Sequence, residues 1–204
     1  MKVLVVGNGG REHAIAWKLV QSPQVCQCFC VPGNGGTANL AKCENIPLSV
    51  EDFAGISKLC KDNQVDLVIV GPEIPLSLGI TNYLQAENIK VFGPDQVGAQ
   101  IEASKSWAKA LMEEAGVPTA LGETFTDRVL AQQYIAQQGA PIVVKADGLA
   151  AGKGVIVAST VEEAQNAIAE LFELGFEKLV VEEFLVGEEV SVLALTDGIT
   201  VRPL

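Results

Sequence analysis

The first twenty residues, MKVLVVGNGGREHAIAWKLV (1–20), contain the pattern that decides the fold class. An unbroken apolar run, Val3 to Val6, leads into the glycine turn GNGG at 7–10, and an amphipathic stretch from Arg11 to Val20 follows. A short continuous apolar run is typical of a strand buried on both faces, whereas the amphipathic stretch is typical of a helix that covers it. The sequence therefore predicts a strand, a tight turn and a helix, the opening of a βαβ unit.

The same rhythm continues to residue 93. The expected segments are the strands VCQCFCV (25–31), VDLVIV (65–70) and KVFG (90–93) and the helices DFAGISKLCKD (52–62) and ITNYLQAEN (80–88). Strands that alternate with helices predict an α/β domain with a doubly wound parallel sheet. Ligands bind such sheets at the carboxyl ends of the strands. The glycine- and proline-rich loops expected there are GNGG (7–10), PGNGG (32–36), GPEIP (71–75) and GPD (93–95).

A different arrangement follows. A helix over 103–115 ends at Gly116 and Pro118, so we expect a domain boundary within 100–119. We divide the chain into a Rossmann-like, substrate-side domain, 1–102, and a second unit, 103–204. The elements expected in the second unit are helices at 128–138 and 161–173, strands PIVVKA (141–146), GVIVAS (154–159) and KLVVEEFL (178–185), and a hairpin that turns at Asp197-Gly198.

The composition excludes several classes of protein. The 204 residues are 49% hydrophobic, so the chain can bury a core and is not disordered. The net charge of −11 argues against nucleic acid and anionic membranes as partners. No apolar run approaches the roughly 18 residues of a spanning helix, and no signal peptide opens the chain. We expect a cytoplasmic protein with no nucleic-acid partner and no membrane partner.

Three of the five cysteines, Cys26, Cys28 and Cys30, alternate along an expected strand and would share one face. No histidine or second cysteine pair follows at the spacing of a zinc site, and a cytosolic compartment disfavours disulfides. We therefore interpret the three as buried thiols.

The motif GNGGRE (7–12) stands where backbone N–H groups at a helix start can bind phosphate. It departs from the dinucleotide fingerprint, because Glu12 occupies the third glycine position and Val31-Pro32 stands where a ribose-binding acid is expected. These departures weigh against a nicotinamide-dependent oxidoreductase, which nevertheless stays an alternative, as does a tight turn without a ligand. The only histidine, His13, is interpreted as structural.

The glycine-rich stretch ADGLAAGKG (146–154) is not a P-loop, because Gly154 rather than Ser or Thr follows the lysine and a strand rather than a helix comes next. Such a loop between two strands can fold over a nucleotide as a lid, or can be an ordinary long hairpin loop. Lys145 is a candidate phosphate contact, because a phosphate site beside the lid would need a cation. The acidic stretch VVEEFLVGEE (180–189) could pair with an adenine edge and a ribose, or lie in solvent.

Taken in order, seven motifs resemble one family. They are VGNGGREHAIAWKL, PGNGGTA, DLVIVGPEIPL, FGPD, QIEASKSWAK, GAPIVVKADGLAAGKGVIVA and VVEEFLVGEEVS. Together they resemble the glycinamide ribonucleotide synthetases, the phosphoribosylamine–glycine ligases of purine biosynthesis, over essentially the whole chain. The lid, lysine and EEFL pattern alone would indicate only an ATP-grasp enzyme, because several ligases and carboxylases share it. The resemblance implies a pre-ATP-grasp α/β domain followed by part of an ATP-grasp module.

The resemblance also implies a reaction. ATP would activate glycine as glycyl phosphate, and the amine of phosphoribosylamine would attack it, giving glycinamide ribonucleotide, ADP and phosphate. A carboxylate is a poor electrophile until one oxygen becomes a phosphate leaving group, and Mg²⁺ or Mn²⁺ and lysines offset charge in phosphoryl transfer. Another ATP-grasp carboxylate–amine ligase is the alternative.

Roles carried over from the family fall into two groups. Lys105 and Lys145 match lysines that contact ATP phosphates, the lid at 148–154 includes Gly148, Gly152, Lys153 and Gly154, Glu182 and Leu185 match backbone contacts to adenine, and Glu189 matches the ribose-binding acid. On the substrate side the matching residues are Gly9, Gly10 and Glu73.

Members of this family run to about twice this length. The resemblance places their metal-holding carboxylates and most catalytic groups in the half beyond Leu204, so no metal ligand and no catalytic residue is assigned within this chain. We therefore expect a truncated chain whose residues 1–204 make no glycinamide ribonucleotide at a measurable rate by themselves. A noncatalytic nucleotide-binding fragment is the matching alternative.

Overall fold

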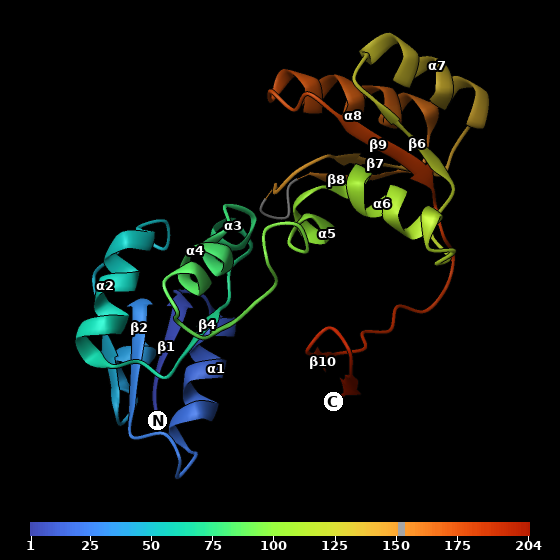
Figure 1. The fold of residues 1–204 in the computed structure, drawn as a ribbon. Helices are drawn as coiled ribbons and strands as arrows, with labels where there is room; N and C mark the ends of the chain where they lie inside the picture. The colour runs from blue at the N-terminus through green and yellow to red at the C-terminus, as the bar shows by residue number, and fades with distance from the viewer. Residues whose placement is uncertain (151–153) are drawn as a thin grey trace.

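The computed structural model describes residues 1–150 and 154–204. Within these residues the chain forms a parallel sheet of five strands, an antiparallel sheet of four and a hairpin of two (Figure 1). The five-stranded sheet belongs to the amino-terminal part and the four-stranded sheet to the part after residue 103. The predicted α/β fold class is confirmed. No helix in the described part of the chain is long and apolar enough to cross a membrane.

The amino-terminal sheet has the order β3-β2-β1-β4-β5, and every neighbouring pair is parallel. Its strands are β1 (Lys2–Gly7), β2 (Gln27–Pro32), β3 (Cys43–Asn45), β4 (Leu67–Val70) and β5 (Val91–Phe92). Four of the five were predicted. The sequence analysis missed β3 because three residues, two of them polar, give no apolar run.

Both faces of this sheet are covered, as the doubly wound prediction required. The helical segments here are α1 (Gly10–Val20), the single 3-10 turn η1 (Thr37–Asn39), α2 (Phe53–Asn63), α3 (Glu73–Ser77) and α4 (Ile80–Ala86). Leu4 and Val6 pack with α2 and α4 on one face, whereas Val3 and Val5 pack with Ala16 of α1 on the other. Because successive side chains of a strand point to opposite faces, one continuous apolar strand supplies both cores.

Two short helices join the sheets. The helix predicted over 103–115 corresponds to α6 (Lys105–Glu114), and the sequence analysis missed the short helix α5 (Gln100–Ala103) that precedes it. The break is at Ser104, which has an extended backbone and whose hydroxyl accepts a hydrogen bond from the N–H of Trp107. Serine is a favoured N-cap because this bond satisfies a free amide at a helix start. The cap places Lys105 at the first position of α6.

The second sheet is antiparallel, with the order β6-β9-β7-β8. Its elements are β6 (Gly122–Phe125), α7 (Arg128–Gln138), β7 (Ile142–Ala146), β8 (Val155–Ala158), α8 (Val161–Glu173) and β9 (Leu179–Glu183). Helices α7 and α8 cover one face, and α6 lies on the other (Figure 1). The sequence analysis missed β6, because GETF carries only one buried apolar side chain.

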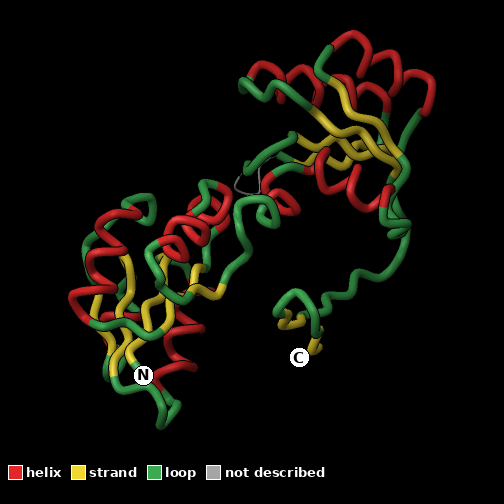
Figure 2. The backbone as a smooth tube through the Cα atoms, in the orientation of Figure 1, coloured by secondary structure: helices red, strands yellow, loops and turns green. Residues whose placement is uncertain are grey.

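After β9 the chain runs as an irregular segment to the hairpin of β10 (Ala194–Thr196) and β11 (Val201–Pro203), as Figure 2 shows. The carboxylate of Asp197 accepts hydrogen bonds from the N–H groups of Ile199 and Thr200, at 3.0 and 2.7 Å, and so closes the turn. All residues of this segment and hairpin are exposed.

Candidate functional site

Two cavities adjoin where the loops of the first sheet meet the second unit. The first, of about 440 Å³, lies between Glu73 at the start of α3 and the glycine-rich loop, with Gly148 and Gly154 in its wall. The second, of about 480 Å³, lies under the four-stranded sheet, between α6 and β7–β9. Glu102, Lys105 and Val155 line both cavities. Volumes of this size are in the range of small-molecule sites.

Lys105 stands at the junction of these cavities. Its Nζ donates a hydrogen bond to the carbonyl oxygen of Gly148, at 2.9 Å. The helix start that carries the lysine is therefore tied to the first glycine of the loop. Both residues were predicted as nucleotide contacts, and the structure brings them together.

Asp147 fixes the base of the same loop and was missed by the sequence analysis. Its carboxylate accepts hydrogen bonds from the Ser104 hydroxyl at 3.1 Å and from both the N–H and the hydroxyl of Ser106. Lys178 Nζ lies 3.4 Å from its second oxygen, and the Asp147 side chain is only 8% exposed. The residues on either side of Lys105 thus hold the residue just before Gly148.

These contacts set the charge of Asp147. Burial by itself would raise the pKa of this carboxyl, but the hydrogen bonds from Ser106 and Ser104 and the charge of Lys178 hold it below its usual value. A carboxylate whose folded pKa is lowered stabilises the fold above its unfolded pKa of about 3.9, and this stabilisation is lost as the pH falls through the folded pKa.

Asp147→Asn is therefore expected to lower the free energy of unfolding near pH 7 by about 1–3 kcal/mol, since an amide cannot accept all of these bonds and leaves donors unpaired. Below the lowered pKa the wild type loses the same contribution, so the two proteins should converge as the pH falls below about 4. Urea unfolding at neutral and acid pH measures the difference. A difference in unfolding free energy between the two proteins that does not change with pH would show that the Asp147 charge does not contribute to stability.

The second cavity contains a buried group of charges. Lys145 on β7 pairs with one oxygen of the Glu182 carboxylate, and Nζ of Lys109 on α6 lies 3.5 Å from the other. Lys109 also donates to the carbonyl oxygen of Ala120. The Glu182 and Lys109 side chains are 11% and 7% exposed. The sequence analysis assigned Lys145 and Glu182 but missed Lys109, although its position one helical turn after Lys105 puts both lysines on one face of α6.

The other predicted nucleotide residues separate into three groups. Leu185 lines the second cavity with Lys145 and Glu182. Glu189 lies on the exposed segment after β9 and does not line either cavity. Gly152 and Lys153 lie outside the described residues. Their assignments stay predictions.

The loop needs small residues at its described ends. A Cβ added to Gly154 would lie 2.5 Å from Cβ of Ala150 and 3.1 Å from Cβ of Ala146. Because real Cβ atoms do not approach so closely, a larger residue at 154 would push the two ends of the loop apart.

In the amino-terminal domain, the side chain of Glu12 holds two glycine loops together. Its carboxylate accepts from the N–H of Gly9 and from Nε of Arg11, both at 2.8 Å, and it is 3% exposed as a residue. A Cβ on Gly71 would overlap Oε1 of Glu12, so the loop after β4 closes directly over this carboxylate. The glutamate that breaks the dinucleotide fingerprint thus fills the space between the loops. The N–H of Gly9 already has an acceptor, and Gly10 lies beside it at the start of α1.

Arg11 links the buried Glu12 carboxylate to the first cavity. Its Nη1 lies 2.7 Å from Oε1 of Glu73, and the guanidinium lowers the pKa of that carboxyl. Glu73 is therefore an ionised residue that faces the cavity beside the loop. Of the three residues predicted for the substrate side, only Glu73 lines a cavity, and Gly9 and Gly10 stay predictions.

Glu73 and Glu182 do not form a magnesium or manganese site. Hard cations need several carboxylate or carbonyl oxygens. Glu73 and Glu182 are each engaged by basic side chains, and the only group of three ligand side chains found among the described residues consists of cysteines. A hard cation beside the two cavities would therefore need oxygen ligands other than these carboxylates.

Two family models match the chain. Phosphoribosylglycinamide synthetase, N domain, matches residues 1–102, and phosphoribosylglycinamide synthetase, ATP-grasp (A) domain, matches residues 103–204. Two relatives named phosphoribosylamine–glycine ligase align with all of this chain, at 64% identity in Nostoc sp. and 65% in Synechocystis sp.. The aligned region is 49% of each relative, so the chain spans about half the length of the curated relatives it matches.

Solved structures give the same result. A phosphoribosylamine–glycine ligase from Thermotoga maritima superposes on the whole chain with a TM-score of 0.81 at 30% identity, over 49% of its own length. A 2-oxoglutarate carboxylase domain from Hydrogenobacter thermophilus, solved with MgADP, covers 90% of this chain and 44% of that chain, with a TM-score of 0.66. At 19% identity this second likeness concerns the fold alone. The chain belongs to the phosphoribosylglycinamide synthetase family, because models of that family match both of its halves and one relative is 65% identical over the whole chain.

Proposed function

We propose that this chain supplies the substrate-side domain and the ATP-binding loop of a phosphoribosylamine–glycine ligase. The observation that carries the proposal is the meeting of two cavities at Lys105, one open to the loops of the parallel sheet and the other to the ATP-grasp sheet. A ligase that couples ATP to a phosphosugar amine needs these two binding regions side by side. The proposed partners are ATP, glycine and phosphoribosylamine, with Mg²⁺ or Mn²⁺ as the cofactor, in the cytoplasm.

In this proposal adenine lies in the second cavity near Leu185, with its edge on the backbone of Glu182 and Leu185, and Glu189 accepts from the ribose. The triphosphate extends toward Lys145 and Lys105 and is covered by the loop at 148–154. These lysines supply positive charge where the transferred phosphoryl group spreads negative charge, which stabilises the transition state. Phosphoribosylamine lies on the side of Glu73, Gly9 and Gly10, where its amine can reach a glycyl phosphate formed at the cavity junction.

The chemistry then follows in two steps. A carboxylate oxygen of glycine attacks the γ-phosphorus of ATP and releases ADP. The amine nitrogen of phosphoribosylamine next attacks the carbonyl carbon of glycyl phosphate, an amide bond forms, and phosphate leaves with the bond electrons. Enclosure by the loop limits the hydrolysis of glycyl phosphate by water.

A chimera tests this function. Residues 1–204 would replace the matching segment of the Synechocystis relative, and ADP release would be followed with ATP, Mg²⁺, glycine and phosphoribosylamine. We expect ADP release that requires both glycine and phosphoribosylamine. A folded chimera that releases ADP with a different carboxylate or amine, while the relative itself retains its activity, would contradict the assignment and favour another ATP-grasp ligase.

Lys145→Ala is expected to raise the Kd of the chain for ATP, or lower turnover of the chimera, by about 10- to 150-fold, the cost of one charge-assisted contact of about 1.5–3 kcal/mol. Calorimetric titration with ATP measures the first effect. Lys18→Ala, at an exposed lysine on α1 far along the chain from the cavities, is the matched control and should leave the Kd unchanged. An unchanged Kd and turnover in Lys145→Ala would exclude a phosphate contact.

A further inference from the structure

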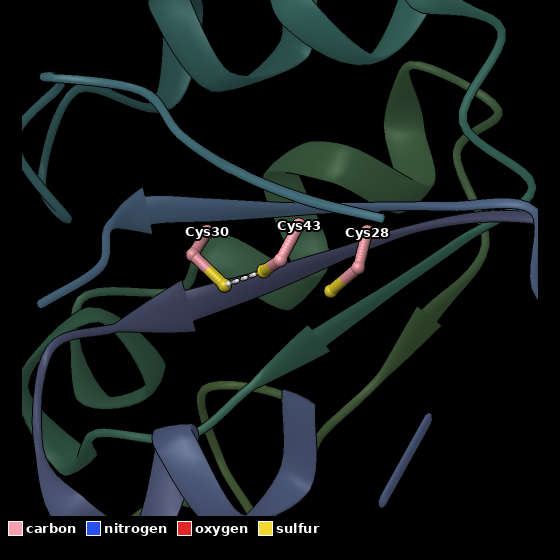
Figure 3. A group of neighbouring side chains, drawn as sticks. All are labelled: Cys28, Cys30 and Cys43. Carbon is pink, nitrogen blue, oxygen red and sulfur yellow. Dashed lines mark hydrogen bonds between the residues drawn. The ribbon is translucent and has the colours of Figure 1, made fainter. Parts of the chain in front are cut away.

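Three cysteines of the amino-terminal sheet bring their sulfur atoms together, away from both cavities. Cys28 and Cys30 lie two residues apart on β2 and share one face, and Cys43 begins the neighbouring strand β3, directly beside Cys28 in the register. Figure 3 shows the three side chains on the same side of the sheet. The three Sγ atoms lie within 4.8 Å of one another, and those of Cys30 and Cys43 are 3.4 Å apart.

The surroundings of this cluster are apolar on the inside and open on one side. Cys28 and Cys30 are fully buried, in a core that also contains Val3, Val5 and Ala16. Cys43 is only half-buried and gives the cluster a route to solvent. Cys26, which the sequence analysis placed on the same buried face, precedes β2 and is exposed. That prediction was wrong for Cys26 because the strand begins at Gln27, two residues later than the predicted start at Val25.

The distances suit three ligands of one soft ion. A Zn–S bond of about 2.3 Å separates neighbouring ligand sulfurs by roughly 3.8–4.0 Å in tetrahedral or trigonal geometry. The separations here, from 3.4 Å up to at most 4.8 Å, bracket that value, so small side-chain rotations reach it. A disulfide would use only two of the three sulfurs and leave the third thiol in the cluster.

The chemistry of the group points the same way. Thiolates prefer soft cations such as Cu⁺, Zn²⁺ and Cd²⁺ to the hard cations that accompany ATP. Binding would release the thiol protons to solvent as each sulfur bonds the ion.

We propose that Cys28, Cys30 and Cys43 form a three-thiolate site for one soft, thiophilic metal ion, with a further coordination position open on the side of Cys43. The site is built by the register of β2 and β3 and is independent of the ligase function. Its occupation would tie an edge strand of three residues to the body of the sheet.

Titration of the reduced, metal-free chain with Cd²⁺ under anaerobic conditions tests the proposal. We expect thiolate-to-metal charge-transfer absorption that saturates at one equivalent and is displaced competitively by Zn²⁺. Cys43→Ser should weaken binding by at least about tenfold, because loss of a residue that only orients a ligand already costs that much. Cys26→Ser, at the exposed cysteine, should bind Cd²⁺ as the wild type does. Absence of the absorption, or equal affinity in Cys43→Ser, would overturn the site.

A second measurement, on the wild type, tests the site even if Cys43→Ser folds poorly. Alkylation of the wild type by iodoacetamide, mapped by peptide mass spectrometry, should modify Cys43 and Cys26 without metal. One equivalent of Cd²⁺ should protect Cys43 and leave Cys26 reactive. Equal protection of both cysteines would mean that the ion binds wherever a thiol is accessible, and equal reactivity of both would mean that it does not reach the cluster. Either result excludes the proposed site.

Discussion

Glu182→Ala is expected to lower the free energy of unfolding of the second unit by about 3–5 kcal/mol, because removal of one member of a buried ion pair leaves the partner charge without compensation. Lys109 would keep only the carbonyl oxygen of Ala120, in a position where its side chain is 7% exposed. Lys145 would lose its carboxylate partner as well. Lys109 and Lys145 then repel each other without a shared carboxylate between them, so β7, β9 and α6 should separate more easily.

The measurement needs a probe confined to the second unit. The chain has two tryptophans, Trp17 on α1 and Trp107 on α6, so Trp17→Phe leaves a single reporter on the helix that carries Lys109. Urea unfolding followed at Trp107 should show the loss, and hydrogen exchange of β1 and β4 should not change. Glu188→Ala, at an exposed glutamate after β9, is the matched control and should fall within about 0.5 kcal/mol of the parent. A loss below about 1 kcal/mol in Glu182→Ala would show that water or other groups already satisfy the lysines.

Long apolar and amphipathic stretches were sufficient to predict most of this fold. Helices α7 and α8 were predicted with the bounds that the structure gives, and β1, β2 and β4 were recognised from runs of Val, Leu, Ile and Cys. The strands that were missed, β3 and β6, are short and polar, and they exist only because a neighbouring strand offers its edge. Whether a short polar segment pairs in this way depends on the tertiary fold, so the local sequence pattern does not predict it.

Only those residues of the candidate site that belong to a recognisable sequence motif could be predicted. The glycine-rich loop and Lys145 follow from local sequence, Lys105 follows from the family resemblance, and the structure gathers them around adjoining cavities. Lys109 and Asp147 were missed because each acts through partners many residues away: Lys109 through Glu182, and Asp147 through Ser104 and Ser106. The sequence analysis noted Glu12 only as a departure from the dinucleotide fingerprint. In the structure its side chain occupies space that a Cβ atom at Gly7, Gly9 or Gly71 would fill.

Leu171→Ala is expected to cost about 2–5 kcal/mol of the stability of the second unit, the usual cost of emptying a buried leucine position. Leu171 is 1% exposed and lies on the face of α8 that packs on the sheet, in the core that includes Val144 and Val181. Alanine is at least as good a helix former as leucine, so the change leaves the helix propensity intact and removes only packing.

Leu174 supplies the control from the same helix. It stands at the carboxyl end of α8, is 64% exposed, and differs from Leu171 in burial rather than in chemistry. Leu174→Ala should therefore change stability by no more than about 0.5 kcal/mol in the same urea experiment at Trp107. Since the sheet beneath α8 also carries Lys145 and Glu182, the loss in Leu171→Ala should be accompanied by faster hydrogen exchange in β7 and β9. Equal effects of the two substitutions would mean that α8 does not hold the four-stranded sheet through this face.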